Sequence, residues 1–313
     1  MKIIYTKNIL FTCLFVLLFF SLPNLFEKHR DAKNWEYIYN VDYDIDILFM
    51  GSSLAFRSLN PNIIDPVINH DSFNLGSSSQ NIIQTYYNLI EVLKYRKIKL
   101  IILDVNTLIT DDVKIGYIYN NISGMYFSKN KINSFLNSIN KNTVSSIVDI
   151  ENLSLFKEFG YVSSMLIKEK FNWKNNIKNY GFSEKSIDTR GFSCRENSIS
   201  LNAYIEAKKS SITNRDISLK NQKYLSKFIN LCKNNNIDLI FLHTPVLARR
   251  TINKLDSYIE KYDIPYYDYN FTSESDYLNY NIEDFSDEFH LSSIGSRKFS
   301  LIFSNSLNYY LNP

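Results

Sequence analysis

The chain has 313 residues, of which 45% are hydrophobic and 21% are charged, a balance typical of a folded globular protein rather than a disordered one. This length is enough to bury a large core. The net charge of +3 is small and no block of Lys and Arg stands out, so composition gives no electrostatic support for nucleic-acid binding.

The N-terminus carries an apolar run over residues 9–22 that only Thr12 and Ser21 interrupt, and Lys2 and Lys7 precede it. This is the layout of a signal peptide or a signal anchor. No small-x-small cleavage site follows, which favours an uncleaved transmembrane anchor over residues 1–26, with a cleaved signal as the alternative. The basic residues before the run predict an inside N-terminus and an extracytoplasmic body, either periplasmic or at the cell surface.

After a polar linker over residues 27–44, short apolar strand signals alternate with helical ones. Strands are expected over residues 45–50, 73–75, 100–103, 239–242 and 265–269, and helices over 80–95, 219–234 and 293–310. The last four residues of the first predicted strand are continuously apolar, as expected when both faces of a sheet are covered. The sequence therefore predicts an α/β fold, a flavodoxin-like three-layer α/β/α sandwich with a five-stranded parallel sheet.

Between residues 110 and 218 this alternation is lost. The stretch is rich in Asn, Lys, Ser and Tyr, with helical signals over 132–139 and 161–170. It is too long for a connecting loop, so we interpret it as a mostly helical insertion in one domain spanning residues 45–313. Its role is open, since it could shape a substrate cleft or serve as a docking surface.

The expected carboxyl edge of the sheet carries a possible catalytic set. Ser53 follows the first strand, and Asp287 stands three residues before His290, between the fifth strand and the last helix. In that arrangement Ser53 would attack a carbonyl carbon, His290 would carry the proton, and Asp287 would hold the imidazole tautomer. Taken singly, Gly-x-Ser after a strand is more often structural, and Asp-x-x-His is more often a surface pair. Their convergence favours a site.

The same edge offers donors for a developing oxyanion. The backbone N–H groups of Ser53 and Gly76 and the side-chain amide of Asn106 are the candidates, because each follows a predicted strand. Gly76 could instead serve a turn, and Asn106 a helix cap. His29 and His70 lack partners in sequence and are expected at the surface, whereas His243 follows the fourth strand, which makes lining of the cleft a minority possibility.

The cysteines indicate no metal centre. Cys13 lies in the N-terminal apolar run, and Cys194 and Cys232 have neither CxxC spacing nor a neighbouring His. A disulfide between Cys194 and Cys232 stays open, because an extracytoplasmic body would permit one. The serine chemistry expected here requires no metal and no cofactor.

Three segments resemble the SGNH (GDSL-type) hydrolase superfamily. They are Gly51-Ser52-Ser53-Leu54, whose Ser53 matches the nucleophile, Phe73-Asn74-Leu75-Gly76, whose Gly76 matches the oxyanion glycine, and Asp287-Glu288-Phe289-His290. The likeness is closest to the membrane-anchored bacterial branch related to alginate O-acetylation proteins and the D-alanyl-lipoteichoic-acid biosynthesis protein. It covers residues 44–106 and 219–308.

The chain departs from this family in two places. Ser52 stands where many members have Asp. The family also has a conserved block between the second and the last of these segments, its third in chain order, and here that block reads Leu103-Asp104-Val105-Asn106 without the expected glycine, so Asn106 matches only in part. The first block also approaches the Gly-x-Ser-x-Gly elbow of α/β-hydrolases. That fold places the elbow after a central strand, whereas Ser53 follows the first one, so the SGNH resemblance is stronger.

The resemblance implies an enzyme acting on ester-linked acyl groups. With an exported, anchored body in the bacterial cytoplasmic membrane, the expected reaction is O-acetyl or O-acyl transfer to, or removal from, a cell-surface or secreted polysaccharide. Family precedent adds a membrane-bound O-acyltransferase as the partner that supplies the acyl group. The alternatives are a non-catalytic accessory subunit of such a system and a free-standing esterase or lipase, although the polar insertion does not suggest a lipase lid.

Overall fold

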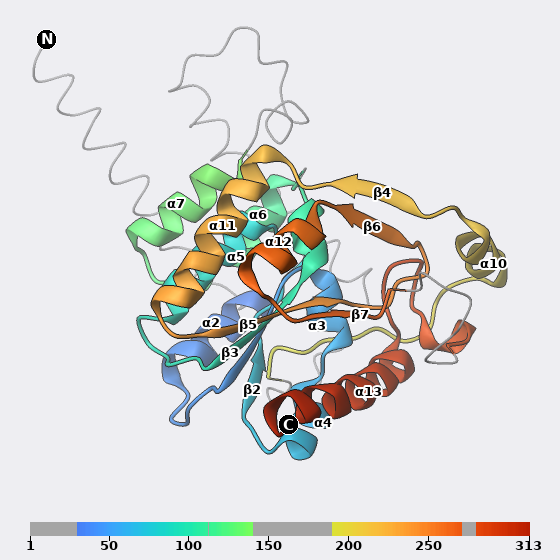
Figure 1. Ribbon diagram of the computed structural model, residues 1–313, viewed down its shortest axis with the longest axis horizontal. Helices are drawn as coiled ribbons and strands as arrows, with labels where there is room; N and C mark the ends of the chain where they lie inside the picture. The colour runs from blue at the N-terminus through green and yellow to red at the C-terminus, as the bar shows by residue number, and fades with distance from the viewer. Residues whose placement is uncertain (1–29, 112, 140–189, 271–279) are drawn as a thin grey trace, which may run out of the picture.

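The computed structural model describes residues 30–111, 113–139, 190–270 and 280–313 (Figure 1). Its centre is a parallel five-stranded sheet in the order β2-β1-β3-β5-β7. The strands are β1 (Ile47–Met50), β2 (Ser72–Asn74), β3 (Leu100–Asp104), β5 (Asp238–His243) and β7 (Tyr266–Asp268). Numbered along the chain, these strands stand in the order 2-1-3-4-5, which is compatible with a flavodoxin-like fold. The predicted α/β class and all five predicted strands are confirmed.

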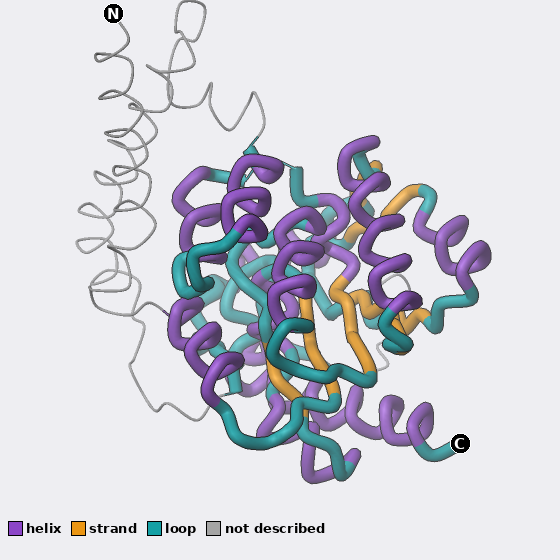
Figure 2. Tube along the Cα trace, turned by 90° about the vertical axis from the view of Figure 1, so that its left-hand side faces the viewer, coloured by secondary structure: helices purple, strands orange, loops and turns teal. Residues whose placement is uncertain are grey.

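Helices cover both faces of the sheet (Figure 2). One face is covered by α2 (Arg30–Asn40), α5 (Ile82–Val92), α6 (Ile115–Ile122), α7 (Lys129–Ser138), α11 (Leu219–Asn234) and α12 (Leu255–Tyr262). The other is covered by α4 (Pro61–Ile68), α10 (Leu201–Lys209) and α13 (Ser293–Leu311). Because strand side chains alternate, Leu48 and Met50 of β1 enter the first core and Ile47 and Phe49 enter the second. This explains why β1 is apolar at every position.

The expected polar linker over residues 27–44 contains a packed helix instead. Trp35 and Ile38 of α2 are buried in the first core, and Asp31 and Asn34 are buried beside them. These four positions recur at helical spacing, so they form one face of the helix. Half of that face is polar, which hid the periodicity from a hydrophobicity-based prediction.

The described part of the expected insertion contains three helices and one strand, and residues 190–200 are mostly irregular. It contributes α6, α7 and α10, and the exposed β4 (Thr213–Asp216), which pairs in parallel with β6 (Arg250–Asn253) outside the main sheet. Helix α7 coincides with the helical signal predicted over 132–139. The signal over 161–170 lies outside the described residues.

The predicted anchor over residues 1–26 and His29 also lie outside the described residues. Within the described part of the chain, no helix combines the length and hydrophobicity that a membrane crossing requires. Cys194 is half-buried and Cys232 is buried in α11, and both are free thiols, so the disulfide left open by the sequence is not formed between them.

Candidate functional site

Ser53 lies at the carboxyl edge of the sheet because β1 ends shortly before it. Ser53 is the first residue of α3 (Ser53–Ser58), and the preceding Ser52 caps that helix by accepting a hydrogen bond from the Leu54 N–H at 3.3 Å. Gly51 makes the turn between strand and helix with a φ of +143°. The half-buried Ser53 is thus held by a capped helix on one side and a glycine turn on the other.

The glycine turn tolerates no side chain. A Cβ at Gly51 would lie 2.7 Å from the Cβ of Asp104, and the backbone conformation itself disfavours an L residue. We expect Gly51→Ala to lower the free energy of unfolding by at least about 1–3 kcal/mol, the range for one strained backbone position. Urea denaturation checks this against Ser53→Ala, which removes only a nearby hydroxyl. Equal midpoints for the two variants would contradict it.

His290 follows the short 3-10 helix η4 (Ile282–Asp284) and precedes α13. Asp287 shapes this loop, since its Oδ1 accepts hydrogen bonds from the backbone N–H groups of Phe289 at 2.9 Å and His290 at 3.0 Å. The same carboxylate lies 2.8 Å (Oδ1) and 2.9 Å (Oδ2) from His290 Nδ1. One residue therefore orders both the turn and the imidazole that it presents.

Ser53 and His290, which are far apart in sequence, contact each other. The Nε2 of His290 lies 2.8 Å from the Oγ of Ser53, although 237 positions separate the residues in sequence. An ionised carboxylate only accepts hydrogen bonds, so Nδ1 carries the ring proton and Nε2 accepts the Ser53 hydroxyl. The predicted residues Ser53, His290 and Asp287 are thus brought together in one hydrogen-bonded chain.

The electrostatics of the pair keep Asp287 ionised and His290 neutral. Burial acts to raise the pKa of Asp287, but hydrogen bonding and attraction to His290 outweigh it and lower that pKa to about 2. Burial lowers the pKa of His290 below its ordinary value, as does the positive charge of Arg57, and the hydrogen bond that His290 donates to Asp287 opposes this. A neutral imidazole is the form that can accept a proton.

The three predicted oxyanion donors differ in their present partners. The Gly76 N–H donates to Asn74 Oδ1 at 3.0 Å, and the Asn106 amide donates to Asp104 Oδ1 at 2.9 Å. The Ser53 N–H makes no hydrogen bond within the described residues. An amide NH₂ has two hydrogens, so Asn106 keeps one further N–H. The oxyanion roles of all three residues stay predictions.

Asp104 supplies a buried carboxylate where β3 ends. It is fully buried and accepts hydrogen bonds from Ser52 Oγ at 2.9 Å and from Asn106. Burial raises its pKa, against the lowering effect of those hydrogen bonds. Ser52 stands where the resembling family often carries Asp; in the structure the carboxylate comes from the neighbouring strand and Ser52 donates to it. The Ser52 hydroxyl therefore links the block around Ser53 directly to the block that contains Asp104 and Asn106.

Sequence reasoning assigned Asn74 no role, yet it ties the second block to the helix that carries Ser53. Its amide donates to the carbonyl oxygens of Ala55 at 3.0 Å and Leu59 at 2.9 Å, while its Oδ1 holds Gly76. Asn74 is fully buried. Its place directly before Leu75-Gly76 was visible, but a buried asparagine at a strand end leaves no periodic signal.

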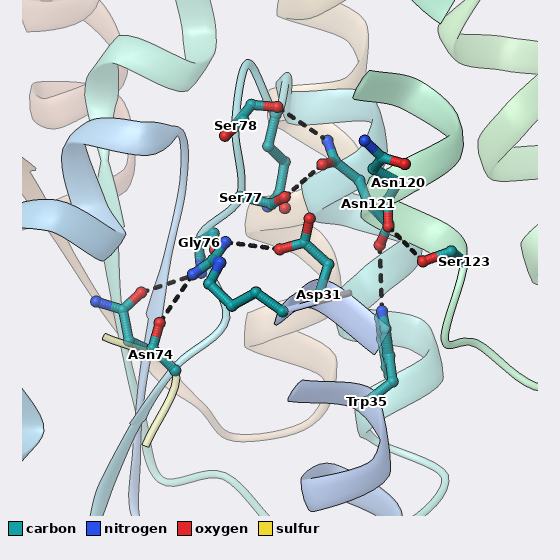
Figure 3. A network of polar contacts seen from close by, with 12 residues as sticks. Asp31, Trp35, Asn74, Gly76, Ser77, Ser78, Asn120, Asn121 and Ser123 are labelled. Carbon is teal, nitrogen blue, oxygen red and sulfur yellow. Dashed lines mark hydrogen bonds and ion pairs between the residues drawn. The ribbon is translucent and has the colours of Figure 1, made fainter. Parts of the chain in front are cut away.

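A polar network from α2 and α6 fixes the loop after Gly76 (Figure 3). Asn121 accepts a hydrogen bond from Ser77 Oγ and donates to the carbonyl oxygen of Ser78 at 3.4 Å, and its own carbonyl accepts from Trp35 Nε1 at 3.1 Å. Arg30, at the start of α2, donates to the Gly76 carbonyl at 2.9 Å. The segment expected to be a linker therefore supports the candidate oxyanion loop.

The other two histidines that the structure describes have partners brought close by the fold. His70, expected at the surface, is partly exposed, and its Nδ1 lies 3.0 Å from Asp46 Oδ2. His243 is buried at the end of β5, where its Nδ1 lies 3.3 Å from the Tyr266 hydroxyl, and burial lowers its pKa to about 3. Among the described residues, no group of three or more His, Cys, Asp and Glu side chains could hold a metal ion.

No protein-family model matches the chain, and no curated protein is significantly similar to it.

Proposed function

We propose that this protein is a serine-dependent acyl-ester enzyme in which Ser53 is the nucleophile, His290 the general base and acid, and Asp287 the residue that orients His290. The single observation that supports this most is the 2.8 Å contact between Ser53 Oγ and His290 Nε2, continued by the 2.8 Å contact between Nδ1 and Asp287. Nucleophile, base and orienting group within hydrogen-bond distance are the geometric signature of this chemistry.

The reaction follows from these positions. Ser53 Oγ attacks the ester carbonyl carbon while its proton passes to His290 Nε2, and the ester C–O bond then breaks as His290 returns that proton to the leaving alcohol. The acyl group remains on Ser53. Water, or the hydroxyl of an acceptor, attacks it next and gives its proton to His290. The bond between the acyl carbon and Ser53 Oγ then breaks as His290 passes that proton to Oγ. Hydrolysis and transfer differ only in this last nucleophile.

The substrate and location that we propose rest on the sequence. The SGNH-type blocks favour acyl esters, and the N-terminal apolar run favours an anchored, extracytoplasmic body. Together they favour O-acetyl or O-acyl transfer to, or removal from, a cell-envelope or secreted polysaccharide, with a membrane-bound O-acyltransferase as the possible acyl donor. Fold alone does not choose among these reactions.

One observation favours a second candidate, a non-catalytic accessory subunit of such an acyltransferase system. Two of the three expected oxyanion donors, the Gly76 N–H and one Asn106 N–H, already donate to neighbouring side chains. An oxyanion would have to compete with Asn74 and Asp104 for them. An accessory subunit would bind glycan or the membrane partner and would turn over no ester.

An aryl acetate assay tests the first proposal. The full-length protein, purified in detergent, is incubated with 4-nitrophenyl acetate, with and without acetyl-free oligosaccharide acceptors, and nitrophenol release and acceptor mass are followed. Turnover that disappears in Ser53→Ala supports the enzyme, and a gain of acetyl on the acceptor identifies transfer. A folded protein with no turnover above Ser53→Ala in either condition favours the accessory subunit.

The state of His290 predicts the pH dependence. Only neutral imidazole accepts the Ser53 proton, and burial with the nearby Arg57 lowers the pKa of His290. We therefore expect kcat/KM to fall on the acid side with a midpoint below the ordinary histidine value of about 6.5. A kcat/KM profile from about pH 4 to 8 with a neutral aryl ester measures it. A midpoint above the ordinary value would contradict the described environment of His290.

A further inference from the structure

Arg57 is a buried charge without an acceptor. It lies one helical turn after Ser53 on α3, and only 5% of its surface is exposed. Its Nη1 is enclosed and has no hydrogen-bond partner, and the side chain forms no hydrogen bond or salt bridge with any described residue. A guanidinium carries five N–H donors, so this degree of burial without acceptors is unusual.

The charges around Arg57 do not compensate it. Burial lowers its pKa to about 10, Arg195 and Arg30 lower it further by repulsion, and Asp287 and Cys194 act in the opposite direction. Asp287 is already shared between His290 and two backbone N–H groups. Arg57 therefore stays charged near neutral pH.

Arg57 lies on the same short helix as the proposed nucleophile, Ser53. Ser53 and Arg57 are four positions apart on α3, and residues at that spacing lie on the same face of a helix. The positive charge of Arg57 acts on both His290 and Asp287, whose pKa values it lowers. The segment that carries Arg195 runs alongside, because the Ser193 N–H donates to the Phe56 carbonyl at 3.0 Å and the Ser293 N–H to the Arg195 carbonyl at 2.8 Å. Arg57 thus lies on α3 beside the segment that carries Arg195, and that segment contacts the start of α13 directly after the histidine loop.

We propose that Arg57, with Arg195 adding positive potential, binds a carboxylate or phosphate group carried by the ester substrate, about one helical turn from the carbon that Ser53 attacks. This inference rests on the proposed function and names the substrate class, an anionic ester. The planar fork of Arg matches carboxylate and phosphate oxygens in a bidentate arrangement. Such a ligand would supply the acceptors that the described residues do not provide.

Matched esters test the specificity. The hydrolysis of 4-acetoxybenzoate, 4-acetoxyphenyl phosphate and monophenyl succinate is compared with that of methyl 4-acetoxybenzoate, for wild type, Arg57→Met, Arg57→Lys and the exposed-arginine control Arg297→Met. Taking the variant-to-wild-type ratio for each ester cancels intrinsic reactivity. We expect Arg57→Met to lose about ten- to a hundredfold more kcat/KM on at least one anionic ester than on the neutral one. Arg57→Lys should restore part of this.

The pattern across the esters identifies the ligand. Selective loss on the benzoate or the phosphate places the anion on the alcohol side and tells carboxylate from phosphate, and selective loss on the succinate places it on the acyl side. An equal loss on all four esters, or the same selective loss in Arg297→Met, overturns the proposal.

A binding measurement separates this inference from the proposed catalysis. Inorganic phosphate is titrated into Ser53→Ala and into Ser53→Ala/Arg57→Met, and the melting temperature is followed. We expect phosphate to stabilise the first protein and not the second, whether or not the enzyme hydrolyses any ester. Without phosphate, Arg57→Met should melt at the same or a higher temperature, because it removes an uncompensated buried charge. No phosphate shift in Ser53→Ala, or a strongly destabilised Arg57→Met, overturns the proposal.

Discussion

Replacement of Ser53 by Ala is expected to reduce ester turnover by about 10⁴- to 10⁶-fold. The hydroxyl that His290 Nε2 contacts at 2.8 Å is lost, so no covalent acyl intermediate can form. The fold should persist, because the Ser53 side chain makes no other hydrogen bond within the described residues. Steady-state kinetics on 4-nitrophenyl acetate measure the loss.

The neighbouring Ser52 provides a matched control. Its hydroxyl donates to Asp104 and caps α3, so Ser52→Ala should lower stability by about 1 kcal/mol while most of the activity remains. A Ser53→Ala protein that is as active as Ser52→Ala would mean that another group is the nucleophile.

Replacement of Asp287 by Asn is expected to lower kcat by about 10⁴-fold, the effect of losing the group that holds the tautomer in serine triads. The side-chain oxygen of the introduced amide could still accept the backbone N–H groups of the loop, so the turn should form. What is lost is the negative charge that holds the proton on His290 Nδ1 and raises the pKa of that histidine. Glu288→Gln, which neutralises the neighbouring exposed carboxylate, is the control.

Asp287→Asn also gives an independent prediction about the pH dependence of the residual activity. Without the Asp287 charge, the pKa of His290 should fall further, so the residual activity should persist to lower pH than in wild type. An acid-side midpoint of the residual activity at higher pH than in wild type would argue against Asp287 as the orienting group, and so would a kcat close to that of wild type.

The central strands of the sheet were predictable because they are apolar on both faces. Strands such as β1 and β3 feed two cores at once, which makes them continuous apolar runs bounded by Gly or Asp. Helix α2 was not predictable in the same way, because Asp31 and Asn34 share its buried face with Trp35 and Ile38. The exposed strand β4, whose sequence is Thr-Asn-Arg-Asp, carries no alternation at all.

The residues of the site were predictable, but their hydrogen-bond partners were not. Parallel topology alone places Ser53, Gly76, Asn106 and the Asp287 loop at one edge. Which donors are engaged depends on side-chain hydrogen bonds of Asn74 and Asp104, and no local sequence pattern encodes those partners. His70 has no partner beside it in sequence, and its contact Asp46, 24 positions away, was hidden for the same reason.

The described contacts also join the first described helix to the candidate site. Arg30 holds the Gly76 and Gly191 carbonyls at 2.9 Å each, and its guanidinium carbon lies 3.8 Å from the centre of the Phe56 ring on α3. Gly191 has a φ of +82° and passes so close to Asn74 that no side chain would fit there. Arg30 therefore connects helix α2 to the Gly76 loop, to the segment that carries Arg195, and to the helix that carries Ser53.

The most direct test of the central claim is covalent labelling of Ser53 with a fluorophosphonate, followed by intact mass and peptide mapping. An activated serine should give one adduct on the wild-type protein, located at Ser53. The adduct should be absent in Ser53→Ala, retained in Ser52→Ala, and formed much more slowly in His290→Ala. A folded wild-type protein that forms no adduct, or an adduct that persists in Ser53→Ala, would contradict the account.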